Sequence, residues 1–253
     1  MARRSSAFDA IRTSGSGVPF AVRALRAPLR LLLWLVMSAG LRITVEGRRA
    51  DGPAVVVSNH PNVIDGMLVL MADASLRPVA RWHRSAVVRV GLWIGNCVIT
   101  TTGTPVSPHC GAFAAALEHL RDGGRVWIAP EGGWQPHLTL RSPRTGAVRL
   151  AHAAGVPIQV LVVEHDQHPG PDVARWPLRS RPGVTLRWGP LVAVSGDVAA
   201  DIDRMMSALA AATGMTWSGW HVTDAHERAP RVGRDAVPQD RPRTSPDHDT
   251  RVS

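Results

Sequence analysis

The chain has 253 residues, 45% of them hydrophobic, which is enough for one domain with a full core plus appendages. All 29 basic residues are arginine and the formal net charge is +9, so the chain favours anionic partners such as lipid headgroups, phosphorylated carriers or nucleic acid. Because the arginines are scattered and no nucleic-acid-binding motif accompanies them, a specific nucleic-acid partner ranks last. Cys97 and Cys110 form no metal or disulfide pattern, which indicates a reducing compartment, inert thiols and no zinc site.

The N-terminal region divides into two segments. Residues 1–17 are polar and predicted to be disordered. Residues 18–41 contain the apolar run Leu31–Met37 among arginines, and this run is far shorter than the roughly 20 residues of a membrane-spanning helix. We predict a helix lying in the membrane interface, with its arginines at headgroup level and its Leu/Trp face in lipid. A signal peptide, and a helix packed on the domain's own core, are the alternatives.

From residue 42 to 215, strand-like and helix-like stretches alternate, and residues 216–253 form an Arg/Asp/Pro-rich tail that is predicted to be mostly disordered. This alternation favours an α/β fold, with a central mixed sheet flanked by helices on both faces. The expected strands are 42–46, 54–58, 77–81, 98–101, 126–129, 157–163 and 184–188. The expected helices are 63–74, 83–90, 110–121, 146–154 and 198–213.

The strongest functional signal lies between the second strand and the helix after it. His60 stands at the strand end and Asp65 in the first turn of the helix, where the helix dipole favours a carboxylate. Asp65 can accept a hydrogen bond from Nδ1–H of His60 and leave Nε2 as a base, which is the base-and-orienter half of a nucleophilic triad. Since no protein nucleophile lies nearby, the nucleophile would come from the substrate. The alternative is a helix-capping histidine beside an ordinary first-turn acid, because the pattern is short.

A second candidate motif follows the apolar strand 126–129 and reads Pro130-Glu131-Gly132-Gly133. The glycines permit positive φ and the close approach of a ligand. Their amides can donate to an oxyanion or a phosphate. Glu131 would lie at a strand end, as His60 does. An ordinary turn is the alternative, because proline and glycine are common in turns.

Together the two motifs resemble those of the glycerolipid acyltransferases of the lysophosphatidic acid acyltransferase type. Asn59-His60-(x)4-Asp65 matches the first family motif and Pro130-Glu131-Gly132 the start of the third. Residues 144–147 and 154–158 resemble the later basic-x-G-A and G-V-P-I segments, so that the similarity extends over about residues 41–192.

The resemblance implies a membrane-associated enzyme of phospholipid metabolism at the cytoplasmic membrane face, with anionic lipids as partners. His60 would act as general base, oriented by Asp65, and histidine suits this role because it titrates near neutral pH. The acyl donor would be a thioester of coenzyme A or acyl carrier protein, with no cofactor and no metal. The candidate substrate-binding residues are Asn59, Arg81, Glu131, Gly132, Gly133 and Arg144.

The chain departs from the family pattern at two arginines that the family uses to hold the acceptor's phosphate. Gly133 and Trp134 stand where Thr-Arg is usual, and the second motif, residues 95–101, ends in Thr101 instead of arginine. Without two bidentate phosphate ligands, either other arginines substitute or the acceptor is a lysophospholipid, glycolipid or polyketide-like hydroxyl. The possible substitutes, with the strand-end arginine first, are Arg81, Arg84 and Arg144.

Three other functions remain open. A thioester hydrolase would use the same His–Asp pair to activate water. A membrane-binding scaffold that has lost its activity would retain the pair beside degraded acceptor motifs. A nucleic-acid binder would show steeply salt-dependent binding.

Overall fold

The computed structural model describes residues 24–62, 64–83, 85–100, 111–133, 139–166 and 181–217. Several sequence predictions therefore lie outside the described residues: those for residues 1–17, for nearly all of the tail 216–253, and for Arg84, Thr101, Cys110 and Trp134.

The centre of the domain is a seven-stranded mixed sheet in the order β1-β7-β6-β2-β5-β3-β4. Neighbouring strands are parallel except β6 and β7, which pair antiparallel, so the expected mixed sheet is confirmed. The strands are β1 (Arg42–Glu46), β2 (Ala54–Val57), β3 (Leu76–Arg81), β4 (Val98–Thr100), β5 (Arg125–Ile128), β6 (Ile158–His165) and β7 (Gly183–Val192).

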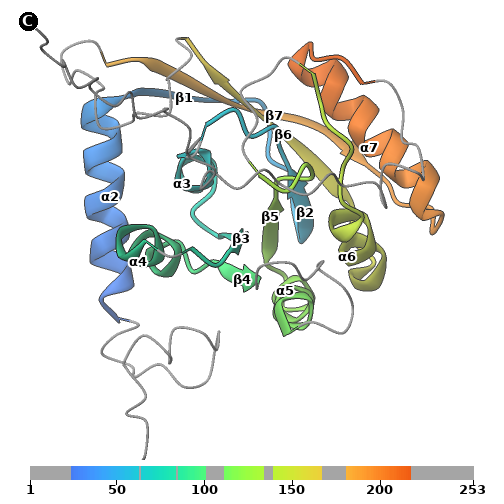
Figure 1. Ribbon diagram of the computed structural model, residues 1–253, viewed down its shortest axis with the longest axis horizontal. Coiled ribbons are helices and arrows are strands. Elements are labelled where there is room, and N and C mark those ends of the chain that lie inside the picture. The colour runs from blue at the N-terminus through green and yellow to red at the C-terminus, as the bar shows by residue number, and fades with distance from the viewer. Residues whose placement is uncertain are drawn as a thin grey trace, which may run out of the picture.

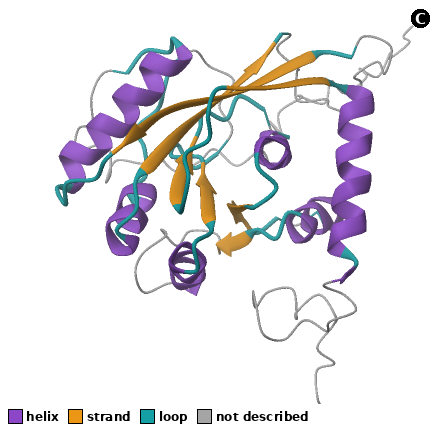
Figure 2. Cartoon of the chain, turned by 180° about the vertical axis from the view of Figure 1, so that it is seen from behind, coloured by secondary structure: helices purple, strands orange, loops and turns teal. Residues whose placement is uncertain are grey.

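Helices lie on both sides of this sheet (Figures 1 and 2). One side carries α5, α6 and α7, and the other carries α3 with α2 and α4 beside it. This arrangement confirms the α/β class. The helices are α2 (Arg26–Gly40), α3 (Asp65–Ala72), α4 (Ala86–Ile94), α5 (Gly111–Arg121), α6 (Gly146–Ala154) and α7 (Val198–Thr213).

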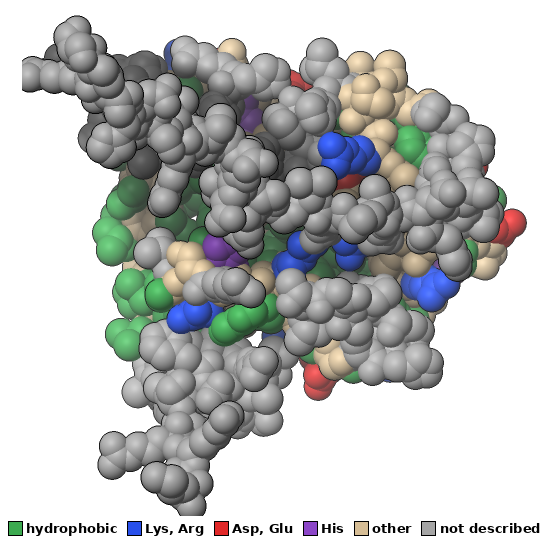
Figure 3. Space-filling model, viewed as in Figure 1, with side chains coloured by type: hydrophobic (Ala, Val, Ile, Leu, Met, Phe, Trp, Pro, Cys, Tyr) green, Lys and Arg blue, Asp and Glu red, His purple; other side chains and the backbone are tan. Residues whose placement is uncertain are grey.

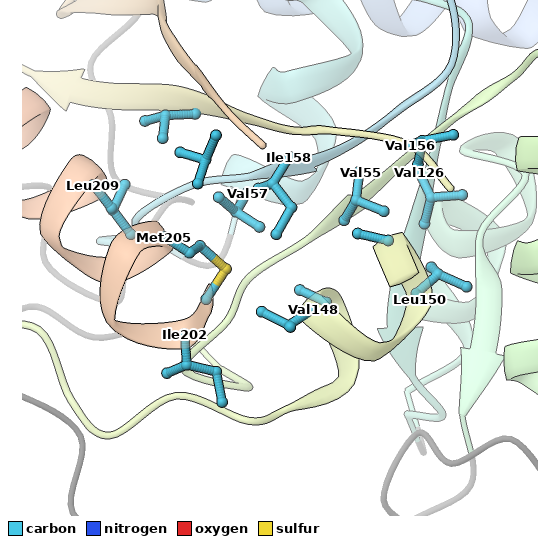
Figure 4. Close-up of a cluster of buried hydrophobic side chains, with 14 of the residues drawn as sticks. Val55, Val57, Val126, Val148, Leu150, Val156, Ile158, Ile202, Met205 and Leu209 are labelled. Atoms are coloured by element: carbon cyan, nitrogen blue, oxygen red, sulfur yellow. The ribbon is translucent and has the colours of Figure 1, made fainter. Parts of the chain in front are cut away.

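The core consists of two apolar clusters, one on each face of the sheet. Successive strand residues point to opposite faces, so Val55 and Val57 join one cluster and Val56 the other. Figure 4 shows the first cluster, in which β2 packs against Val148 of α6 and Met205 of α7. Full burial of a side chain of this size contributes about 1.5–3 kcal/mol, and burial on both faces explains why β2 has no polar residue.

None of the residues of helix α2 is buried. Its apolar residues Leu31, Leu32, Trp34, Leu35 and Val36 are each between 48 and 59% exposed. Figure 3 shows hydrophobic side chains along the edge of the molecule where α2 lies. In the described part of the chain, no helix has the length and apolarity to cross a membrane.

The two arginines that α2 contains both hydrogen-bond to the rest of the domain, and their position at headgroup level stays a prediction. Arg30 donates from Nε to the Ile94 carbonyl and from Nη2 to the Gly95 carbonyl, both at 3.0 Å. Arg26 donates to Asn96 Oδ1 at 2.7 Å and stacks over the Trp93 ring. Because carbonyls at the end of a helix are strong acceptors, these arginines attach α2 to the domain and leave its apolar face outward.

Candidate active site

The candidate residues gather at one edge of the sheet because four adjacent strands, β6, β2, β5 and β3, run parallel. Their carboxyl ends therefore meet at the same edge, which is where α/β proteins place their functional residues. His60 follows β2, Arg81 ends β3, the Pro130–Gly133 turn follows β5, and His165 ends β6.

His60 and Asp65 form the hydrogen-bonded pair that their spacing predicts. His60 Nδ1 lies 3.1 Å from Asp65 Oδ2, and the Asp65 side chain is fully buried while that of His60 is 14% exposed. The turn between them is fixed locally: Asn62 donates its N–H to Asp65 Oδ2 at 2.6 Å and accepts from the Ile64 N–H at its own Oδ1. This geometry directs Nδ1 inward and leaves Nε2 on the opposite side of the ring.

A second histidine, His165, also binds Asp65. Its Nε2 lies 2.8 Å from Asp65 Oδ1, and its side chain is only 4% exposed. Burial would raise the pKa of Asp65, but the hydrogen bonds from His165 and His60, together with their charges, outweigh burial and hold that pKa below its ordinary value. Asp65 is therefore an ionised acceptor between two imidazoles.

Trp127 of β5 packs against His60. The ring centroids are 5.7 Å apart at an interplanar angle of 83°, an edge-to-face arrangement that aromatic rings favour. The indole is itself fixed, since its Nε1–H donates to Ser58 Oγ at 2.9 Å and the residue is 3% exposed. The indole therefore restricts the imidazole on a side that Asp65 does not contact.

Asn59 connects the loop after β2 to β6. Its Nδ2 donates to the Val163 carbonyl and its Oδ1 accepts from the Val163 N–H, both at 2.8 Å. The residue is only 6% exposed. We expected Asn59 to bind substrate, but with both ends of its amide on the backbone of β6, it holds the His60 loop in place.

The Pro130-Glu131-Gly132-Gly133 turn fixes a backbone shape that only glycine adopts readily. Gly132 has a φ of +75° and donates its N–H to the Ala129 carbonyl at 3.0 Å. This hydrogen bond corrects the expectation that its amide would bind an oxyanion, because the donor is already used within the turn. An oxyanion role for the Gly133 amide stays a prediction.

Two of the predicted arginines converge on Gly132. Arg81 donates from Nη2 to the Gly132 carbonyl at 3.3 Å. The Arg144 side chain lies beside the Cα of Gly132. A Cβ added to Gly132 would come within 2.9 Å of Arg144 Cδ and 3.0 Å of Arg144 Cζ. Because Arg144 also donates its N–H to the Pro130 carbonyl at 2.8 Å, the turn and both guanidinium groups form one unit.

Glu131 completes this edge. Its Oε2 accepts the Arg141 N–H at 3.0 Å. Burial raises the pKa of Glu131, and the hydrogen bond and charge of Arg141, followed by the charge of His60, oppose that rise. Glu131 therefore lies within electrostatic reach of the candidate base.

The sequence reasoning missed four residues of this site: Ser58, Trp127, Arg141 and His165. Ser58 and Trp127 lie in two of the expected strands, 54–58 and 126–129. The strand pattern alone does not show that the Trp127 side chain faces His60 or that Ser58 holds it there. The signal for His165 was a histidine just beyond an expected strand end, the same feature that marked His60.

Metal-dependent chemistry and thiol chemistry have little support at this site. Within the described ranges, no group of three or more His, Cys, Asp or Glu side chains could hold a metal ion. Burial raises the pKa of Cys97 to about 12, so its thiol carries almost no thiolate at neutral pH and is inert, as expected.

The fold and the His–Asp pair at the sheet edge agree with an independent sequence comparison. Residues 42–164 match the family model described as Acyltransferase, and this range contains His60, Asp65, Arg81 and the Pro130–Gly133 turn. About half of the chain, residues 42–164, is therefore similar to the acyltransferase family.

Curated proteins that are similar to this chain include several 1-acyl-sn-glycerol-3-phosphate acyltransferases alpha. The mouse (Mus musculus) protein is 30% identical over an alignment of 149 residues that covers 54% of this chain and 50% of the relative. The human (Homo sapiens) protein is 29% identical, with the same coverage of both chains. The chain thus spans about half the length of these relatives. The crystal structure of the 1-acyl-sn-glycerophosphate (LPA) acyltransferase PlsC from Thermotoga maritima matches with a TM-score of 0.55 and 18% identity over 83% of each chain, a likeness of fold.

Proposed function

We propose that this protein is a membrane-associated O-acyltransferase that moves a fatty acyl group from a thioester to the hydroxyl of a lysophospholipid or related lipid. The observation that carries the proposal is the His60–Asp65 pair, whose Nδ1···Oδ2 contact of 3.1 Å lies at the edge of a sheet of the glycerolipid acyltransferase fold. With Nδ1 bonded to Asp65, Nε2 is the nitrogen that can accept a proton.

In the proposed reaction, His60 Nε2 takes the proton of the acceptor hydroxyl as that oxygen attacks the thioester carbonyl carbon. Asp65 holds the imidazole in the required tautomer and stabilises the imidazolium that forms. The tetrahedral intermediate then expels the thiolate, which receives the proton from His60. An ester and a free thiol result, with no acyl-enzyme. An oxyanion donor such as the Gly133 amide would contribute about 3 kcal/mol.

The acceptor's headgroup would bind beside the Gly132 turn. Arg81 and Arg144 both contact Gly132, so their guanidinium groups can compensate for the two family arginines that this chain lacks. Guanidinium is the side chain best suited to phosphate oxygens. This placement favours a phosphorylated acceptor over a neutral glycolipid, with coenzyme A or acyl carrier protein as the donor carrier.

Membrane association would come from α2. Its five apolar side chains from Leu31 to Val36 are about half exposed or more, and a run of exposed leucines with a tryptophan suits the interface of a bilayer. The hydrogen bonds from Arg30 to the Ile94 and Gly95 carbonyls fix this helix to the catalytic domain. We propose a peripheral or monotopic protein on the cytoplasmic face of the membrane.

The test is release of free thiol from palmitoyl-coenzyme A by the full-length protein in detergent. The acceptors are lysophosphatidic acid, lysophosphatidylglycerol, a neutral glycolipid and none. We expect release that requires a phosphorylated acceptor and that is lost in His60→Gln. His152→Gln is the matched control, because His152 forms a second His–Asp pair with Asp201 in the α6–α7 region, outside the site. Release without any acceptor would point to a hydrolase, and a thioester left intact under all conditions would favour a scaffold.

A further inference from the structure

We propose that His165 is a positioning residue of the active site, which fixes the Asp65 carboxylate so that Asp65 can hold His60 in one tautomer. The expected effect of His165 on the rate of acyl transfer rests on the proposed function. Its effect on the tautomer of His60 does not, since the tautomer can be measured without any substrate.

The first observation is the way in which Asp65 is bonded. Oδ2 faces His60 Nδ1 at 3.1 Å and the Asn62 N–H at 2.6 Å. Oδ1 faces His165 Nε2 at 2.8 Å. Because the carboxylate is fully buried, hydrogen bonds from protein groups must replace the water that it loses on folding.

The second observation is geometric. Both partners of Oδ2 belong to the loop that leads into α3, so they follow Asp65 if this loop shifts. His165 instead comes from β6, a hundred residues further along the chain. A bond to each oxygen from a different element defines the plane of the carboxylate, and therefore the direction in which Oδ2 meets the imidazole.

The third observation concerns the support of His165 itself. It pairs with Val184 of β7, and the following residue, Asp166, donates its N–H to the Gly183 carbonyl at 3.0 Å. The same strand holds Asn59 through the Val163 backbone. Strand β6 thus holds two residues of the site in place. Its Val163 backbone binds Asn59, the residue before the candidate base, and its His165 side chain binds Asp65, the carboxylate that orients that base.

This arrangement assigns a proton to each ring. Since Asp65 accepts at both oxygens, His165 carries its proton on Nε2 and His60 carries one on Nδ1. Mutation of the outer-shell groups that orient metal ligands typically costs about 10- to 100-fold in affinity or activity, and we expect an effect of similar size for a group that orients the partner of a general base. His165 does not reach the substrate in this account, and its effect is on the rate of proton transfer.

The test compares His165→Gln with His165→Asn. The glutamine amide reaches about as far as imidazole Nε2 and keeps a donor for Asp65 Oδ1, whereas the shorter asparagine amide does not. Both substitutions bury an amide at the same place, so they are matched for polarity. Melting temperatures check that both variants fold.

The first measurement is nitrogen-15 NMR of the histidine rings, with His60 assigned by comparison with His60→Gln. We expect the wild type and His165→Gln to hold the His60 proton on Nδ1, and His165→Asn to populate both tautomers. The second measurement is acyl transfer, for which we expect His165→Asn to lose about 10- to 100-fold in kcat with an acceptor KM within about twofold, and His165→Gln to recover most of that loss.

Two results would overturn the inference: an unchanged His60 tautomer in His165→Asn, or a glutamine variant as impaired as the asparagine variant. If the wild-type protein transfers no acyl group, that result contradicts the proposed function but not the inference about His165. The NMR comparison still decides whether His165 controls the His60 tautomer.

Discussion

The Arg144 side chain occupies the space beside Gly132 that the Cβ of any other residue would fill. Such a Cβ would lie 2.9 Å from Arg144 Cδ and closer still to Nε, while the φ of +75° at Gly132 belongs to the left-handed region that disfavours side chains. Gly132 thus determines both the shape of the turn and the position of a guanidinium group. In the proposed function, that guanidinium binds the acceptor's headgroup.

Substitution Gly132→Ala is expected to displace Arg144, because the end of a flexible side chain moves more readily than the backbone of the turn. We predict an increase of about tenfold in the acceptor KM, for a lost charge-assisted contact of about 1.4 kcal/mol, and a loss of about 1–2 kcal/mol in unfolding free energy from left-handed strain. Gly52→Ala is the matched control, since Gly52 has a φ of +80° with nothing within 4 Å of an added Cβ. A control variant that also changes KM would refute a specific role for Arg144.

Glu131→Gln is expected to stabilise the fold and slow the reaction. Burial raises the pKa of Glu131 above its ordinary value of 4.5, so ionisation opposes folding once the pH exceeds 4.5. The amide should therefore raise the melting temperature at pH 7.5 and have no effect near pH 3.5, where the carboxyl is protonated in both states. We also expect kcat to fall about tenfold, because the variant lacks the charge that stabilises the His60 imidazolium. Glu46→Gln, at an exposed strand position, should do neither.

Asp65→Asn is expected to destabilise the protein in a pH-dependent manner. The folded-state pKa of Asp65 is depressed below 3.8 by its two histidines, so its contribution to stability is present above pH 3.8 and is lost as the pH falls through the depressed value. Urea unfolding should show a deficit of about 2 kcal/mol or more at pH 7, and a smaller deficit near pH 3. The exposed Asp51→Asn variant is the control, and equal deficits of Asp65→Asn at both pH values would contradict the assigned ionisation.

Arg125 provides a test of stability remote from the site. It donates to Asp73 Oδ2 at 2.9 Å, to the Gly52 carbonyl at 2.8 Å and to the Ala50 carbonyl, and the side chains of the ion pair are 6% and 3% exposed. Without Arg125, the Asp73 carboxylate keeps only Arg49 as a cationic partner, at 3.1 Å and with a side chain that is 46% exposed. Arg125→Gln should therefore cost about 3 kcal/mol in urea unfolding, the lower end of the range for breaking a buried pair. Arg48→Gln, from an almost fully exposed pair, should cost less than about 1 kcal/mol.

The exposed face of α2 should control membrane binding. The double variant Leu31→Ser, Leu35→Ser is expected to weaken binding to phosphatidylglycerol vesicles by at least about tenfold, because each leucine contributes more than 1 kcal/mol when it leaves water. Flotation on a density gradient measures this partitioning. Leu191→Ser is the matched control, since Leu191 is equally exposed at 52% on β7. If all variants float as the wild type does, α2 is not the membrane contact.

Elements with local signals could be predicted from the sequence with their bounds. Helix α6 ends before Gly155, which adopts the left-handed conformation, and α7 begins after Asp197, whose side chain accepts two amide hydrogens; both helices match the prediction residue for residue. The expected helix 83–90 instead lies at Ala86–Ile94 and continues through Gly91. A Cβ on Gly91 would meet Met67 of α3 at 4.0 Å, so this glycine lies at a helix contact, where the prediction had ended the helix.

Within the site, the sequence predicted contacts between neighbours in the chain but missed contacts across the fold. His60 and Asp65 are five residues apart and meet as expected. His165 reaches the same carboxylate only because β6 lies beside β2 in the sheet. Likewise, the carbonyl acceptors that Arg30 meets at the end of α4 became visible only in the folded chain.

The most direct test of the central claim is mass spectrometry of the lipid products after incubation with carbon-13-labelled palmitoyl-coenzyme A and lysophosphatidic acid. The account predicts labelled phosphatidic acid, its loss in His60→Gln, and its retention in His152→Gln. Intact-protein mass spectra should show no acyl-enzyme in any variant. Labelled free palmitate without labelled phosphatidic acid, or phosphatidic acid formed equally well by His60→Gln, would contradict acyl transfer with His60 as the base.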